Sequence, residues 1–336
     1  MKLRYLFLSL VAAIMLLTIY ANAASSPSYA LFPVNVQGKW GYIDKAGKLD
    51  IQPQFEEAKP FSEGLAQVKI DQKWGYIDQT GKCVIAPQFQ GNAPFSNGMA
   101  GIRRENKWGY IDTKGKIVVN PNFQQVTGFS QGYGVVQTPS CCGGKWIFVD
   151  TKGLILADRF FLQAKKFSEG LGAVREKSWG YIDTKGNNVL KPQFEVANNF
   201  SNGLASVANR AGHNQAGKYG FIDKAGKWAI KPTFERAGTF SEGMARIRID
   251  ELWGYVNPSC KIVITPQFQN ADPFSDVMAA VKIDYKWGYI NKAGQVIIEP
   301  IFDRVYSFLN GLALVRIGSQ LKYIDKQGNT VWQFDE

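Results

Sequence analysis

One aromatic decapeptide recurs along the chain at nearly constant spacing. It reads KWGYIDKAGK at 39–48, KWGYIDQTGK at 73–82 and KWGYIDTKGK at 107–116. Five of the eight intervals between its tryptophan positions are 34 residues; these positions are Trp40, Trp74, Trp108, Trp146, Trp179, Tyr219, Trp253, Trp287 and Leu321. A fixed period of this length indicates a repeat architecture, in which each unit is stabilised by packing on its neighbours.

The pattern inside each unit is that of β-strands. Trp40, Tyr42 and Asp44 alternate with Gly41 and Ile43, which is the period of two expected of a strand. An Asp-x-x-Gly turn follows, and its glycine suits the left-handed position of a bulged hairpin. The decapeptide therefore predicts a strand and the turn after it.

The rest of the unit predicts two more strands. The second, as at 82–87, closes on a proline, which has no N–H and is expected to end the pairing. A loop with two phenylalanines six residues apart follows, and a Ser-x-Gly turn leads into the third strand, as at 65–70. We therefore expect an all-β fold of eight units with three antiparallel strands each, plus a closing partial unit, spanning 31–336.

We expect these units to form a curved, open array, with a closed propeller-like ring as the alternative. A propeller blade usually has four strands, which favours the open form. No helix longer than two turns is expected after residue 23. Ile147 replaces the decapeptide glycine and Val277 replaces the Ser-x-Gly glycine, so these two units are expected to be locally distorted.

The repeated segments also resemble a known family. The Trp-Gly-Tyr-Ile-Asp core, the Pro-x-Phe and the Phe-Ser-x-Gly-Leu-Ala segments are similar to those of the bacterial WG-repeat family, over essentially 31–336. The resemblance implies a β-rich repeat domain, often on exported bacterial proteins. It brings no catalytic residues that could be transferred to this chain.

The N-terminus has the pattern of a secretory signal. Lys2 and Arg4 precede an apolar run from Leu6 to Leu17, and Ala21-Asn22-Ala23 fits a cleavage site. We expect cleavage after Ala23, a short linker at 24–30 and a secreted or periplasmic protein; an uncleaved membrane tether is the alternative. Removing 23 of 336 residues, with two cations and no acids, leaves 313 and lowers the net charge from +11 to +9.

The positive charge predicts an acidic partner. Lysine and arginine recur on the polar face of the third strand, and in register they would form a cationic stripe. With the single histidine, in an expanded loop, the candidate binding residues are Lys69, Arg103, Arg175, Arg246, Arg248, Lys282, Arg316 and His213. The expected ligand is an acidic polysaccharide, a cell-wall polymer or another envelope protein, whereas export makes nucleic acid a poor partner. The alternative is that these cations deter edge-to-edge strand pairing.

Catalytic, cofactor and metal sites are not expected. The turn aspartates lack the density of a calcium loop, and no phosphate loop, HExxH or nucleophile elbow is present. We predict a non-enzymatic binding or scaffold protein; the alternative is an envelope-acting hydrolase or isomerase. The tryptophans are interpreted as packing between units, with a sugar-stacking ladder as the alternative.

The four cysteines are too few for a disulfide scaffold. Cys83 and Cys260 lie five units apart, so in an open array we predict two free thiols and no disulfide between units. Cys141 and Cys142 belong to the opposite hairpin edge and, as neighbours in sequence, would bond each other only with strain.

Overall fold

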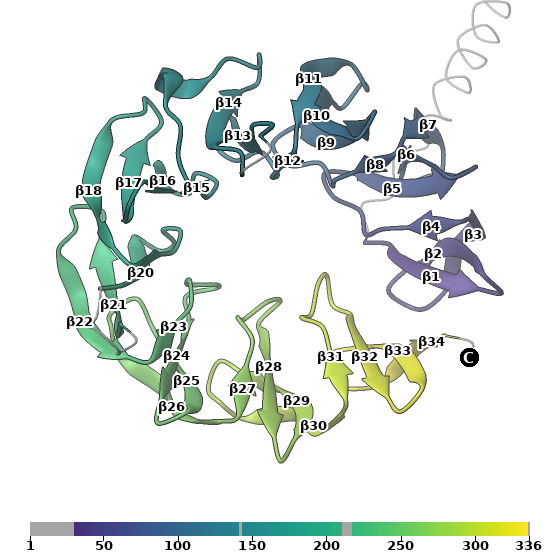
Figure 1. Ribbon diagram of the computed structural model, residues 1–336. Coiled ribbons are helices and arrows are strands. Elements are labelled where there is room, and N and C mark those ends of the chain that lie inside the picture. The colour runs from purple at the N-terminus through teal and green to yellow at the C-terminus, as the bar shows by residue number, and fades with distance from the viewer. Residues whose placement is uncertain (1–29, 141–142, 210–216, 335–336) are drawn as a thin grey trace, which may run out of the picture.

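The computed structural model describes residues 30–140, 143–209 and 217–334. In this part of the chain, nine small antiparallel sheets follow one another around a central axis and close into a ring (Figure 1). The protein is therefore a nine-bladed β-propeller. The expected open array is wrong, and the alternative of a closed ring is confirmed.

The blades are numbered in chain order from the N-terminus. Blade 1 consists of β1 (Phe32–Val36), β2 (Lys39–Ile43) and β3 (Leu49–Phe55). Blade 2 consists of β4 (Glu57–Ala58), β5 (Leu65–Ile70), β6 (Lys73–Asp78) and β7 (Cys83–Phe89). Blade 3 consists of β8 (Gly91–Asn92), β9 (Met99–Arg104), β10 (Lys107–Asp112) and β11 (Ile117–Phe123). Blade 4 consists of β12 (Gln125–Val126), β13 (Tyr133–Gln137) and β14 (Trp146–Asp150). Blade 5 consists of β15 (Gln163–Ala164), β16 (Leu171–Arg175), β17 (Trp179–Asp183) and β18 (Asn188–Phe194). Blade 6 consists of β19 (Val196–Ala197), β20 (Leu204–Ala208), β21 (Tyr219–Asp223) and β22 (Trp228–Phe234). Blade 7 consists of β23 (Arg236–Ala237), β24 (Ala245–Ile249), β25 (Leu252–Val256) and β26 (Ile262–Phe268). Blade 8 consists of β27 (Asn270–Ala271), β28 (Met278–Ile283), β29 (Lys286–Asn291) and β30 (Val296–Phe302). Blade 9 consists of β31 (Arg304–Val305), β32 (Ala313–Ile317), β33 (Gln320–Ile324) and β34 (Thr330–Gln333).

Each sequence unit is shared between two blades. The chain leaves β3 at Phe55 and enters the next sheet at once through β4, whose two residues pair with β5 as Glu57↔Lys69 and Ala58↔Val68. This short strand forms the inner edge of the blade, and the strand after the Asp-x-x-Gly turn forms the outer edge (Figure 1). The expected three-stranded unit is therefore wrong, because part of the phenylalanine loop supplies a fourth strand.

The decapeptide glycine and the proline belong to one bulge. β2 pairs with β3 as Tyr42↔Ile51 and Trp40↔Phe55, with a register shift between them. A Cβ on Gly41 would lie 2.5 Å from the carbonyl oxygen of Ile51 and 2.8 Å from the nitrogen of Pro53. Pairing resumes after the proline, so the expectation that proline ends it is wrong: Pro53 lies inside an outer-edge strand at a bulge, where no ladder donor is needed.

The Asp-x-x-Gly turns have the predicted form. Oδ1 of Asp44 accepts hydrogen bonds from the N–H groups of Ala46 and Lys48, both at 2.9 Å. Gly47 has φ +83°, the left-handed conformation that glycine adopts without strain. The turn prediction is confirmed.

The hydrophobic core lies between blades. Tyr42 of blade 1 packs on Phe61 of the next blade with ring centroids 4.9 Å apart, and its hydroxyl donates to the carbonyl of Lys59 at 2.8 Å. The same hydroxyl bond joins Tyr76 to Ala93, Tyr110 to Thr127, Tyr181 to Asn198, Tyr255 to Asp272, and Tyr289 to Tyr306. The second phenylalanine of the six-residue spacing, which is Phe61 in this unit, therefore packs against the aromatic ring of the preceding blade.

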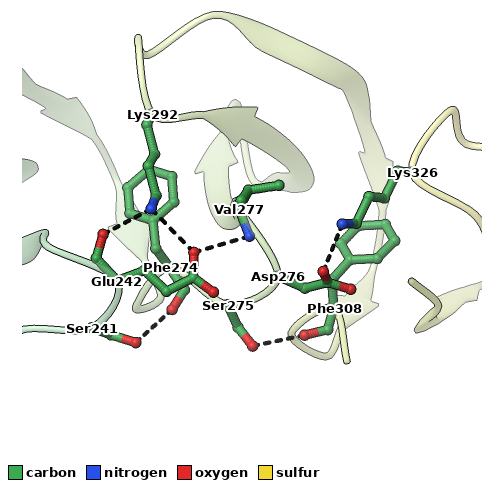
Figure 2. Close-up of polar contacts among 9 residues, drawn as sticks. All are labelled: Ser241, Glu242, Phe274, Ser275, Asp276, Val277, Lys292, Phe308 and Lys326. Carbon is green, nitrogen blue, oxygen red and sulfur yellow. Dashed lines mark hydrogen bonds and ion pairs between the residues drawn. The ribbon is translucent and has the colours of Figure 1, made fainter. Parts of the chain in front are cut away.

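The Ser-x-Gly turns, such as that at 62–64, and the equivalent turn at 275–277 form a second set of junctions between blades, which we call the turn belt. Figure 2 shows it between blades 7 and 9, where the Ser275 hydroxyl donates to the carbonyl of Phe308 at 2.7 Å. The Glu242 carboxylate accepts from the N–H of Val277 at 3.0 Å and lies 3.3 Å from the Lys292 ammonium. The serine bond recurs from Ser62 to Phe95, Ser96 to Phe129, Ser130 to Phe167, Ser168 to Phe200 and Ser241 to Phe274.

Blades 9 and 1 meet without sharing a sheet. Phe32 and Val34 of β1 form one buried cluster with Leu312 and Tyr323 of blade 9. The Tyr323 hydroxyl donates to the carbonyl of Pro33 at 3.2 Å, and its ring lies 5.7 Å from that of Phe32. The ring therefore closes by side-chain packing.

The two expected distortions have different outcomes. Blade 4, which contains Ile147, has three strands in the described residues, and a three-residue 3-10 helix, Leu156–Asp158, follows its turn. Blade 8 keeps four strands, because Val277 itself adopts the left-handed conformation with φ +65°. The first expectation is confirmed and the second is wrong.

The cysteine and helix predictions agree with the structure where it describes the chain. Cys83 and Cys260 are free thiols on blades 2 and 7, so ring closure does not bring them together. Cys141 and Cys142 lie outside the described residues, as do residues 1–29 with the predicted signal sequence. Across 30–334, apart from the two gaps, no helix has the length and apolar character needed to cross a bilayer.

Candidate functional site

Six of the seven predicted strand cations share one register. Each pairs across the sheet with the residue at the tryptophan position, as Lys69 does with Trp74 and Arg103 with Trp108. The other four pairs are Arg175↔Trp179, Arg248↔Trp253, Lys282↔Trp287 and Arg316↔Leu321. All six lie near the short hairpins that join the second and third strands of a blade, at the end of the ring that we call the hairpin face.

Two of the six cations are partly neutralised by acids. The Lys69 ammonium lies 2.9 Å from the Glu57 carboxylate on the inner strand, and its hydrogen bond holds the pKa of Glu57 below its usual range. The Arg248 guanidinium lies 3.8 Å from Glu235 and 4.0 Å from Glu251. These half-exposed pairs compete with any acidic ligand.

The other four make no ion pair with any described residue. Arg103 donates to the side-chain oxygen of Asn106 at 2.7 Å, and the Lys282 ammonium lies 6.0 Å from the centre of the Tyr285 ring. Arg175 donates to Gln163 at 3.4 Å, and its Nε is buried without a partner among those residues. Arg316 is exposed. Blades 3, 5, 8 and 9 therefore carry the available charge.

Arg246 does not belong to this register. It pairs with Tyr255, and its guanidinium donates to the carbonyl of Ala271 in the next blade at 2.6 Å. It also lies 5.0 Å from the centre of the Trp253 ring. These contacts make Arg246 an inter-blade residue, and its inclusion in the predicted stripe is wrong.

The predicted stripe is also interrupted. The same register holds Asn35, Gln137 and Ala208 on blades 1, 4 and 6. His213 lies outside the described residues. The structure therefore brings together a set of cations with gaps at three blades.

The tryptophans of this register pack in the protein. Most are half-buried against the inter-blade clusters, as Trp40 and Trp74 are, and Trp179 is buried. The Lys165 ammonium lies 5.3 Å from the centre of the Trp179 ring, and burial lowers the pKa of that lysine. These contacts support the packing interpretation.

The turn aspartates act as caps. Burial alone would raise the pKa of Asp183, but hydrogen bonds from Asn187 and Lys185 outweigh it and hold this pKa below its usual value. Within the residues that the structure describes, no cluster of three histidine, cysteine or acidic side chains has the geometry to hold a metal ion.

Sequence reasoning missed a hollow between blades 4 and 5. Lys145, Phe160, Leu162, Lys177 and Lys191 are among its lining residues, and its volume is about 730 Å³. The signal was present in the sequence as two apolar residues, Phe160 and Leu162, on either side of a buried phenylalanine.

Comparison with known families gives one assignment. The model of a family described as "WG containing repeat" matches seven segments: 40–74, 74–108, 108–138, 179–210, 219–253, 253–287 and 287–320. The stretch between 138 and 179, which includes most of the outer edge of blade 4, is not matched. No curated protein matches the chain.

Solved structures show a likeness in fold. A structure titled "Crystal structure of the eukaryotic initiation factor" is 11% identical over 93% of this chain and 97% of that one, with a TM-score of 0.51. The dihydro-heme d1 dehydrogenase NirN is 13% identical over 94% and 82%, with a TM-score of 0.48. Hsv2p of Kluyveromyces lactis is 10% identical over 69% and 91%, with a TM-score of 0.43. At 11% identity the likeness to the first of these structures concerns the fold alone.

Proposed function

Because this chain belongs to the WG containing repeat family and folds as a nine-bladed ring, we propose that it is an exported, non-enzymatic protein that binds an acidic polymer. The polymer would lie across the hairpin face. The shared register of six cations is the observation that carries this proposal.

The spacing of the cations favours an extended ligand. Cations at one register on six of the nine blades match a chain whose own charges repeat better than they match a small anion. Long-range attraction between such arrays raises the association rate and weakens with salt. A carboxylate-rich polysaccharide of the cell envelope has this chemistry.

The non-enzymatic part rests on what the polar side chains already do. Tyrosine hydroxyls such as that of Tyr42 donate to the next blade, turn aspartates such as Asp44 cap their own turns, and serines such as Ser275 join loops. These groups are used by the scaffold, and the ring of cations offers electrostatic binding.

The test is binding of residues 24–336 to polygalacturonate, a linear polymer of carboxylates, at low and high salt. The variant Arg103→Gln/Lys282→Gln/Arg316→Gln removes three available charges. At about 0.5 kcal/mol each, their loss predicts roughly tenfold weaker binding and a shallower salt dependence.

The matched control removes three lysines from turns at the other end of the blades, Lys114→Gln/Lys152→Gln/Lys185→Gln, all exposed. It has the same net charge as the test variant and should retain binding. Equal losses in both variants, or binding that is insensitive to salt, would contradict a site on the hairpin face.

A further inference from the structure

The outer edge of blade 4 has an exposed apolar residue on each side of its phenylalanine, whereas the equivalent positions on the other blades are polar except for Ile301. Phe161 is buried, as is the outer phenylalanine of most blades, but its neighbours Phe160 and Leu162 are 56% and 49% exposed. The residues before the equivalent phenylalanines are Gln54, Gln88, Asn122, Gln193, Thr233, Gln267 and Ile301, and those after are Glu56, Gln90, Gln124, Glu195, Glu235, Gln269 and Asp303. Blade 4 is the one that is apolar at both positions.

Leu162 also cannot make a hydrogen bond that residues at the equivalent position make in other blades. At this position Gln269 accepts from the N–H of Tyr285 at 2.8 Å, and Glu56 accepts from the N–H of Gln72 at 3.0 Å. These bonds hold the hairpin of the next blade. A leucine cannot accept one, so neither hairpin support nor solubility explains its presence.

Free lysines surround the two apolar side chains. Lys145, Lys177 and Lys191 line the same hollow as Phe160 and Leu162, and their ammonium groups form no ion pair with any described residue. Glu176, the acid in the lining, is held by the Arg159 guanidinium at 2.8 Å. The hollow therefore combines an exposed apolar pair with available positive charge.

We propose that this hollow docks the protein on a membrane surface that contains acidic lipids. Phe160 and Leu162 enter the boundary between headgroups and acyl chains, as the apolar side chains of peripheral proteins do. The three lysines lie against the lipid phosphates and keep their ammonium groups in water. Asn188, Lys191 and Pro192 of β18 line the hollow, and β18 lies at the outer rim of the ring (Figure 1).

Charge and position favour lipid over a protein groove. A protein partner would bring its own paired charges, whereas an acidic leaflet offers a continuous layer of phosphates to lysines on three different segments. The site uses neither Arg103, Lys282 nor Arg316, so the inference does not depend on the proposed polymer site.

The test is co-sedimentation of residues 24–336 with vesicles of phosphatidylcholine, with or without phosphatidylglycerol. Binding is expected to the acidic vesicles alone. Phe160→Gln/Leu162→Gln installs residues that other blades carry, so it should fold, and it should bind about tenfold or more weakly. Each lysine-to-glutamine change should weaken binding about fivefold.

The matched control is Ile301→Gln, because Ile301 occupies the position of Phe160 on blade 8 and is 53% exposed. Its binding should equal that of the unaltered protein. No binding to acidic vesicles would overturn the proposal, as would wild-type binding by the Phe160→Gln/Leu162→Gln variant. Equal binding to neutral vesicles would overturn the role of the lysines.

Discussion

Blade 8 and blade 4 contain equivalent decapeptide strands, but blade 8 has four strands and blade 4 has three in the described residues. In blade 8 a Cβ on Gly288 would lie 2.5 Å from the carbonyl oxygen of Ile298 and 2.8 Å from the nitrogen of Pro300. In blade 4 the buried Ile147 stands at that position, and a 3-10 helix replaces the proline-containing strand. The glycine and the bulged strand therefore depend on each other.

The largest expected effect comes from giving blade 8 the residue of blade 4. Gly288→Ile places a side chain where the backbone of β30 lies, so the outer strand must move away. The free energy of unfolding should fall by at least the roughly 1–3 kcal/mol of an overpacked site. Amide hydrogen exchange across 296–302 should rise more than elsewhere in the blade.

A glycine with space around it serves as the control for that variant. The nearest atom to a Cβ on Gly91 would be the Cβ of Arg103 at 3.6 Å, so Gly91→Ala should leave stability nearly unchanged. Unaltered exchange at 296–302 in Gly288→Ile would show that the strand tolerates the side chain.

The blade-to-blade hydroxyl bond should give a smaller effect. Tyr289 donates to the carbonyl of Tyr306 at 2.8 Å, whereas blade 4 has Phe148 at the equivalent position. Burial raises the pKa of Tyr289 well above its usual value, so the hydroxyl remains a donor. Tyr289→Phe should cost about 1 kcal/mol, measured by urea unfolding, and Tyr285→Phe, at an exposed ring, should cost much less.

Local features were predictable because the residues that make them are close in sequence. Asp44 and Gly47 define a turn within four residues, and the alternation around Tyr42 defines a strand. The inner strands were missed because two residues, such as Glu57 and Ala58, show no periodicity. The cation register was largely predictable, but its neutralisation at Lys69 was not, because the acid lies on such a strand.

Ring closure had no local signal. It rests on Tyr323 and Pro33, which are 290 residues apart in sequence. Whether an array closes depends on small rotations between successive blades, and no single unit determines their sum. Ile147 did give a local signal, because a side chain at that position is incompatible with the bulge.

The smallest expected effect is a pH dependence in the turn belt. The Asp276 carboxylate of blade 8 lies 2.6 Å from the Lys326 ammonium and accepts from the N–H of Gly311. At the corresponding place in blade 4, the uncharged Gln131 accepts from the N–H of Gly170 at 2.9 Å. Acid should therefore weaken the first junction and leave the second unchanged.

The sign follows from the depressed pKa of Asp276. Partial burial alone would raise this pKa, but hydrogen bonds from Lys326 and Gly311 outweigh it and hold the value below its usual range. The resulting stability is present above the unfolded-state pKa of about 4 and is lost as the pH falls through the folded-state value. Because the pair is partly exposed, the loss should stay below about 1 kcal/mol.

Two substitutions, one in blade 8 and one in blade 4, test this difference in acid sensitivity between the two junctions. Asp276→Asn keeps an acceptor for Gly311 and should reduce the loss of stability between about pH 7 and about pH 3. Gln131→Glu should add a loss of the same sign, because a carboxylate accepting the Gly170 N–H is stabilised in its charged form. Urea midpoints at both pH values measure the two changes. Identical acid sensitivity in Asp276→Asn and the unaltered protein would place the titrating group elsewhere in the ring.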